Sequence, residues 1–142
     1  MSISARNVFE GKISAITEGP VHAEVSLTTE GGDTIVAVVT ETSVKTLGLA
    51  VGGVAKAFVK APGIMVLADE SGLRFSARNH LSGSVAAVVP GAVNSEVVVT
   101  LAGGSQVKAV VTNEAVAEMQ LAAGKPASVL FKASQVILGV PV

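Results

Sequence analysis

The tetrapeptide Ser-Ala-Arg-Asn occupies residues 4–7 and occurs again at residues 76–79, 72 positions further along the chain. The correspondence continues at this offset without a gap. Among the matching pairs are Gly11 with Gly83, Glu24-Val25 with Glu96-Val97, Gly31-Gly32 with Gly103-Gly104, Thr40 with Thr112, and Lys60-Ala61 with Lys132-Ala133. Identity at one constant offset indicates two copies of one unit. Two copies are too few for a solenoid, so we expect two compact domains, each with its own core.

The boundary between the copies is marked by the polar stretch Asp69-Glu70-Ser71-Gly72, which ends in glycine as linkers often do. We therefore divide the chain into a first domain at residues 1–69, a linker at 70–75 and a second domain at 76–142.

Apolar residues often alternate with other residues along 13–27 and again along 85–99, which is the period of half-buried strands. A Gly-Gly pair in each copy then supplies the positive φ of a tight hairpin turn. The turn leads into a third strand, expected at residues 34–40 and 106–112.

A short helix is expected after the third strand, where Thr40 or Thr42 can cap its first turn and Gly52 ends the segment. Residues 54–60 and 64–68 then form strands four and five. The order β-β-β-α-β-β is that of an OB-type barrel. We predict an all-β chain with one short helix per repeat, folded as two tandem OB-type five-stranded β-barrels.

The composition excludes several classes of protein. The net charge of −1 argues against partners held by bulk electrostatics, such as a nucleic-acid backbone or an acidic membrane surface. The longest apolar runs, such as residues 35–39, are strand-sized and too short to span a bilayer. Residues 1–12 do not resemble a secretory signal, and no cysteine is present to form a disulfide or a thiolate metal site. A cytoplasmic location fits these features.

The chain is 49% hydrophobic and only 15% charged. Small domains bury a limited share of their surface when alone, and a surface this poor in charge is sticky. We therefore expect the protein to be an oligomer.

The repeated Ser-Ala-Arg-Asn motif combines a hydroxyl, an always-charged planar guanidinium and an amide, which can converge on an oxyanion. The alternative is that Ser and Asn shape a turn while Arg lies in solvent. Four polar-rich positions kept identical between copies favour a shared use.

A second repeated feature is Lys60-Ala61-Pro62, which returns as Lys132-Ala133-Ser134. A loop lysine can serve solubility alone, but with the arginine of the first motif it gives two cations per repeat, enough to balance a dianion. Thr40 and Ser43 add hydroxyls and first-turn N–H groups, which favour anions. Their counterparts are Thr112 and Ala115. Helix capping explains the same residues equally well, and both interpretations stay open.

Other chemistries find little support in the sequence. His22 and His80 have no histidine counterparts at the repeat offset, and no metal-ligand spacing, Ser-His-Asp set or phosphate loop stands out. Glu24 and Glu96 are equivalent but have no evident partner. The only aromatic residues are four phenylalanines, too few for a stacking groove that binds single strands. We predict that the chain is not an enzyme and does not bind nucleic acid.

The combined pattern resembles the Mop domain of the molbindin family. The resemblance rests on Ser-Ala-Arg-Asn, Gly-x-Val-(His/Asn)-x-Glu-Val, the Val-Thr that ends strand three and Lys-Ala-(Pro/Ser). It covers residues 4–68 and 76–140 approximately. A tandem pair is similar to free-standing cytoplasmic di-Mop molbindins, which implies storage or buffering of molybdate, with tungstate as a second candidate ion. The resemblance also implies a homotrimer, with no membrane partner and no organic cofactor.

The family places oxyanion pockets at subunit interfaces, which implies a set of binding residues here. They are Ser4, Ala5, Arg6, Asn7, Thr40, Ser43, Lys60 and Ala61 in the first repeat, and Ser76, Ala77, Arg78, Asn79, Thr112, Lys132, Ala133 and Ser134 in the second. A second class of site, near the threefold axis, has weaker candidates in two turns. These are Gly19, Val21 and His22, with Gly91, Val93 and Asn94.

Two departures from the family pattern predict inequivalent pockets. Ala115 lacks the hydroxyl that Ser43 has, and Pro62 lacks both the hydroxyl and the N–H of Ser134. We expect Thr112 to share a pocket with Ser134, and Ser43 to lie in the other pocket, so that each gains one donor and lacks another. The alternative function is a structural OB-type module that pairs with another protein through its apolar face.

Overall fold

The computed structural model describes residues 2–69 and 72–142. Glu70 and Ser71, in the expected linker, lie outside the described residues, as does Met1. The described chain forms two five-stranded antiparallel sheets and two short α-helices, which confirms the all-β class. None of the helices in this part of the chain is long and apolar enough to cross a membrane.

Each repeat contributes five strands, one α-helix and one 3₁₀ turn. The first repeat has β1 (Asn7–Glu18), β2 (His22–Thr29), β3 (Thr34–Thr40), α1 (Glu41–Leu47), β4 (Val54–Val59), η1 (Ala61–Gly63) and β5 (Met65–Leu67). The second has β6 (Asn79–Pro90), β7 (Asn94–Leu101), β8 (Gln106–Thr112), α2 (Asn113–Met119), β9 (Pro126–Phe131), η2 (Ala133–Gln135) and β10 (Ile137–Gly139). Both third strands and the helices are confirmed. The helix ends earlier than expected, because Gly48 takes the left-handed conformation at φ 64° and caps it, ahead of Gly52.

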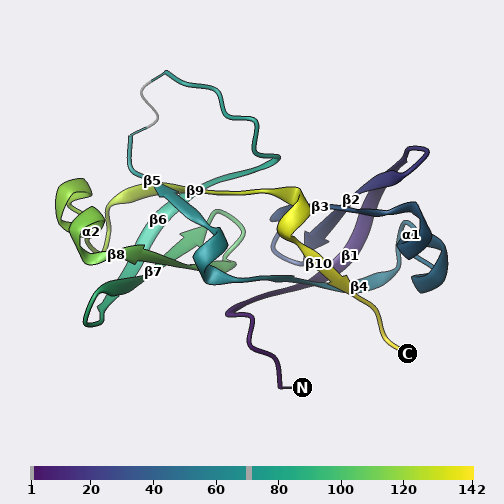
Figure 1. Ribbon diagram of the computed structural model, residues 1–142, viewed down its shortest axis with the longest axis horizontal. Coiled ribbons are helices and arrows are strands. Elements are labelled where there is room, and N and C mark those ends of the chain that lie inside the picture. The colour runs from purple at the N-terminus through teal and green to yellow at the C-terminus, as the bar shows by residue number, and fades with distance from the viewer. Residues whose placement is uncertain (1, 70–71) are drawn as a thin grey trace.

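The fifth strands are exchanged between the repeats. One sheet has the order β10-β4-β1-β2-β3 and the other β5-β9-β6-β7-β8. Leu138 of β10 pairs with Ala57 of β4, and Val66 of β5 pairs with Val129 of β9. Figure 1 shows the two barrels side by side along the long axis, with α1 and α2 at opposite ends and the connections that lead to β5 and β10 passing between the barrels near the middle.

The exchange corrects the expectation that each repeat closes its own barrel. The reason lies in the connection from β4 to β5. Lys60 and Ile64, which flank η1, are both extended, at φ −76°, ψ 134° and φ −105°, ψ 127°. The chain therefore runs onward to the other barrel, and does not turn back beside β4. Each core depends on both repeats: Val136 and Leu138 are buried in the same apolar cluster as residues of the first barrel.

Two buried asparagines join the barrels through backbone hydrogen bonds. The Nδ2 of Asn79 donates to the carbonyl of Val36 at 2.8 Å, and the N–H of Val36 donates to Asn79 Oδ1 at 2.8 Å. Asn7 makes the same pair of bonds with Lys108, at 2.8 and 2.7 Å. Val36 and Lys108 lie on β3 and β8, the last strands in their sheets. Each asparagine amide thus provides hydrogen-bond partners for the backbone N–H and C=O of a residue at the open sheet edge of the other repeat.

Replacing Asn79 with alanine tests this bridge. The variant leaves both backbone groups of Val36 without their partner, and an unsatisfied buried group costs about 1–3 kcal/mol. We expect the free energy of unfolding to fall by about that amount, measured by urea denaturation. Asn94→Ala, at an exposed position of β7, is the control. Equal losses in the two variants would contradict the bridging role.

The hairpins after β2 and β7 also meet. The carboxylate of Asp33 accepts hydrogen bonds from the N–H groups of Gly103 and Ser105 at 2.8 and 3.0 Å. A Cβ at Gly31 would lie 1.9 Å from the carbonyl oxygen of Gly103, so only glycine permits this approach. The two repeats form one continuous structure through these contacts.

Candidate functional site

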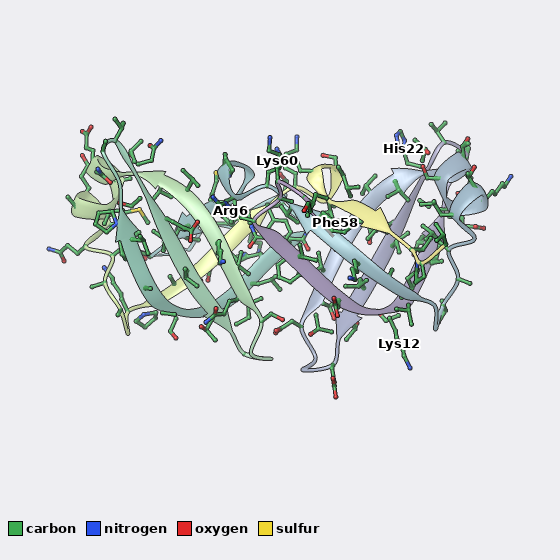
Figure 2. All side chains as sticks on the ribbon, turned by 90° about the horizontal axis from the view of Figure 1, so that it is seen from below. Arg6, Lys12, His22, Phe58 and Lys60 are labelled. Atoms are coloured by element: carbon green, nitrogen blue, oxygen red, sulfur yellow. The ribbon has the colours of Figure 1, made fainter. Side chains whose placement is uncertain are left out.

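Strand pairing in the first barrel brings its two cationic motifs together. Asn7 of β1 lies opposite Val59 of β4, so Arg6 and Lys60, which extend this pair, come to the same end of the two strands. Figure 2 shows Arg6 and Lys60 near the middle of the molecule, where the barrels meet, while His22 lies out over the first barrel. Two cations of one repeat therefore lie at the junction between barrels.

The equivalent motifs of the second repeat line one cleft of about 510 Å³. Its polar lining is Ser76, Arg78, Lys132 and Ser134, with Ala77 and Ala133 between them. Val38, Met65, Phe75 and Leu130 complete it. The structure thus unites six of the predicted residues of this repeat, although they come from segments more than fifty residues apart in the sequence.

A second cleft, of about 360 Å³, gathers hydroxyls from both repeats. Thr40 and Ser43 of the first repeat line it together with Ser134 of the second, and His22 lies on its wall. Ser134 also lines the larger cleft, so the two clefts adjoin. This grouping corrects the expected one, in which Ser134 accompanies Thr112. The strand exchange is the cause, because it packs η2 against β3 and η1 against β8.

The counterpart cluster has fewer donors. There η1, which contains Pro62, packs against β8, which ends at Thr112. Ala115 occupies the position of Ser43, and Pro62 that of Ser134. At these three equivalent positions the first cluster therefore has three hydroxyls, whereas the second repeat has that of Thr112 alone. The two departures from the repeat fall on the same cluster and add together.

The threonines cap their helices. The Ser43 N–H donates to Thr40 Oγ1 at 3.1 Å, and the Ala115 N–H donates to Thr112 Oγ1 at 3.1 Å. In the first cluster the Thr40 and Ser43 hydroxyls also bond to each other at 2.8 Å. Helix capping is thus confirmed. The bond between Thr40 and Ser43 uses one of their two hydroxyl protons, so the other proton and that of Thr112 can rotate toward an anion.

A glutamate stands beside the first hydroxyl cluster. Burial raises the pKa of Glu41, and a hydrogen bond with Glu18 and the charge of Glu18 raise this pKa further, while Lys45 opposes the change. The second repeat has Asn113 at this position, which donates to the carbonyl of Gly91 at 2.9 Å. The repeats therefore differ in charge next to their capping threonines.

The arginines of the two repeats also differ. Arg78 Nη1 donates to Glu24 Oε2 at 2.6 Å, which joins the repeats and supplies the partner that sequence did not reveal for Glu24. Within residues 2–69 and 72–142, Arg6 forms no ion pair. Lys60 and Lys132 likewise form none with a carboxylate in this part of the chain.

Several of the predicted binding residues line neither of these two clefts. Asn7 and Asn79 are 2% and 1% exposed, and their amides are engaged by backbone partners in the other repeat. Ser4 is exposed and Ala5 half-buried just before β1. Ala61 is buried at the start of η1.

The two turns proposed for a second class of site are held by the helices. The Glu41 N–H donates to the carbonyl of Val21 at 2.8 Å, and the Asn113 N–H donates to that of Val93 at 2.9 Å. Both valines stay exposed, at 63% and 71%. The adjoining residues Gly19, Gly91 and Asn94 stay candidates, and of this group His22 is the one that lines a cleft described above.

Comparison with known proteins gives consistent results. The model of the TOBE domain matches residues 3–66 and 76–138. The molybdenum transport protein ModE of Herbaspirillum seropedicae is 43% identical over 140 residues, which are 99% of this chain and 52% of that protein. The molybdenum-pterin-binding protein MopA of Rhodobacter capsulatus is 40% identical over 141 residues, 99% of this chain and 53% of that protein. The chain thus spans about half the length of these curated relatives.

A solved structure is similar over nearly the whole chain. It is that of the cytoplasmic molybdate-binding protein ModG in a crystal form with molybdate bound, with a TM-score of 0.94 and 52% sequence identity. The match covers 99% of this chain and 100% of that one. It confirms the pair of OB-type barrels.

Proposed function

We propose that this chain, which belongs to the TOBE domain family and carries two copies of the domain, binds molybdate and buffers its concentration in the cytoplasm. The observation that carries the proposal is the convergence of Arg78, Lys132 and Ser134 on one cleft. A protein 52% identical over nearly the whole chain, described as cytoplasmic, has been crystallised with molybdate bound.

The proposed mechanism is reversible capture. Guanidinium, ammonium and hydroxyl donors replace the hydration shell of a dianion, and hydrogen bonds with a charged member are about twice as strong as neutral ones. No covalent bond forms or breaks, so the protein acts as a binding protein and not as an enzyme. Tungstate has nearly the same shape and charge and is expected to compete.

We further propose that the protein is a homotrimer whose pockets are completed between subunits. Large apolar residues are exposed on a chain with little charge, among them Val54, Met65 and Ile137 at 56%, 59% and 68%. Met65 lines the cleft that holds Arg78, so a neighbouring subunit covering this residue would also close the site. Sedimentation equilibrium at micromolar concentration is expected to give the mass of three chains, and a stable monomer would contradict the trimer.

Equilibrium dialysis tests the binding function. We expect saturable binding of molybdate, competition by tungstate, and weak competition by sulfate and phosphate. Elemental analysis of the dialysed protein gives the number of ions per chain. Absence of molybdate binding would leave the alternative of an OB-type module that pairs with another protein.

The hydroxyl clusters predict which serines act together. Ser43 and Ser134 line one cleft, so Ser43→Ala and Ser134→Ala should weaken the same subset of sites. Each lost neutral donor is expected to cost about 0.5–1.5 kcal/mol, measured by calorimetric titration with molybdate. Ser84→Ala, an exposed hydroxyl on β6, serves as the control. Effects of the two substitutions on different subsets would contradict this grouping.

The cluster with fewer hydroxyls predicts the reverse change, in which an added hydroxyl strengthens binding. Ala115→Ser restores the hydroxyl that Ser43 supplies in the other repeat. We expect tighter binding at the weaker subset, by about 0.5–1.5 kcal/mol, with the stronger subset unchanged. The same titration measures both subsets, and a change confined to the stronger one would contradict the assignment of Ala115.

A further inference from the structure

We infer that Glu24 is a positioning residue, which holds the Arg78 guanidinium at the rim of the oxyanion cleft. The inference rests on the proposed function and deepens it. It arises from an interaction between repeats that the internal symmetry does not reproduce, because Arg6 has no corresponding ion pair within the described residues.

The geometry places Glu24 beside the cleft and not in its lining. Glu24 lies opposite Val38 in the β2–β3 pairing, and residues directly opposite in an antiparallel pair project to the same face. Val38 lines both adjoining clefts. The Glu24 carboxylate therefore reaches Arg78 from the margin of the site.

The contact restrains the guanidinium and leaves most of it available. Only Nη1 of Arg78 donates to Glu24, at 2.6 Å, whereas a guanidinium carries five N–H donors in a planar fork. The Glu24 side chain is 30% exposed and stands within a strand, whereas that of Arg78 is 58% exposed and precedes one. The less mobile group thus fixes the more mobile one.

Because Glu24 already restrains the Arg78 side chain, less side-chain entropy is lost when the anion binds. Ordering a long side chain on binding costs free energy equivalent to about a three- to ten-fold change in dissociation constant. The opposing effect is repulsion between the glutamate and the dianion. Screening by solvent weakens this repulsion at a half-exposed site, and the charge of Lys132 on the same cleft offsets it further. Positioning is therefore expected to prevail.

The test is a titration of the full-length protein with sodium molybdate, on Glu24→Ala, Glu24→Gln and the double variant Glu24→Ala/Arg78→Ala. We expect Glu24→Ala to raise the dissociation constant of one subset of sites by about three- to ten-fold. Glu24→Gln keeps the shape and one oxygen acceptor, so its binding should stay near that of the wild type. In the Arg78→Ala background, Glu24→Ala should add nothing, because the two residues act through one contact.

The second repeat supplies the matched control, because Glu96 is the counterpart of Glu24. Glu96→Ala should leave molybdate binding unchanged, and thermal unfolding of all variants separates loss of affinity from loss of structure. Tighter binding in both Glu24 variants would show that the carboxylate competes with the ion, and would overturn the inference. An equal effect of Glu24→Ala with and without Arg78 would also overturn it. Wild-type protein that binds no molybdate would refute the proposed function itself.

Discussion

Leu138→Asp is expected to unfold the first barrel, although residue 138 belongs to the second repeat. Leu138 is 8% exposed and lies in β10, which pairs with β4 of the first barrel. A carboxylate at this position would be buried without a counter-charge, which costs about 3–5 kcal/mol. Leu73→Asp is the matched control, because it makes the same change at a leucine that is 64% exposed and lines neither cleft.

Hydrogen exchange read by mass spectrometry locates the damage. We expect Leu138→Asp to remove protection mainly from peptides within residues 7–59, while peptides of β6 to β9 keep more of theirs. The control should exchange like the wild type. Loss of protection confined to residues 79–131 would show that β10 completes its own repeat, against the exchanged topology.

Arg78→Ala and Arg6→Ala are expected to weaken oxyanion binding strongly. Each substitution removes a cation whose hydrogen bonds to a charged partner contribute about 1.5–3 kcal/mol. Calorimetric titration with molybdate should therefore show a loss of roughly ten- to more than a hundred-fold in affinity at the affected sites. The fold should tolerate both changes, because both arginines are exposed.

Arg74→Ala controls for loss of positive charge, because Arg74 is exposed and lies outside the cleft lining. It should bind molybdate like the wild type. If Arg6→Ala and Arg78→Ala bound the full complement of ions at wild-type affinity, the repeated arginines would be ordinary surface residues.

The sequence predicts local structure well and the closure of the barrels poorly. Apolar alternation and the Gly-Gly turns locate β3 and β8 to the residue, since these signals depend on neighbours in the chain. Residues 64–67 and 136–139 have the same short apolar character in both repeats, so their pattern does not reveal which sheet each strand joins. The backbone conformation around η1 and η2 decides that.

The site shows the same limit. The sequence singled out cations and hydroxyls as candidates, and the structure brings many of them together in two adjoining clefts. The grouping of Ser134 and the partner of Glu24 were not predictable, because both arise from contacts between the repeats. The asparagine of the repeated motif is an example, because Asn79, the counterpart of Asn7, makes a structural contact with the edge of β3. Identity between repeats marks a shared use without saying which use.

The most direct test of the central claim is the position of the ion itself. Crystals grown with sodium molybdate and measured near the molybdenum absorption edge give an anomalous peak for each bound ion. We predict a peak in the cleft lined by Arg78, Lys132 and Ser134, within hydrogen-bonding distance of these side chains. We also predict additional protein contacts to the ion from a neighbouring subunit. Ordered molybdate bound only elsewhere on the protein, or no peak from crystals of protein that has been saturated with the ion, would contradict the account.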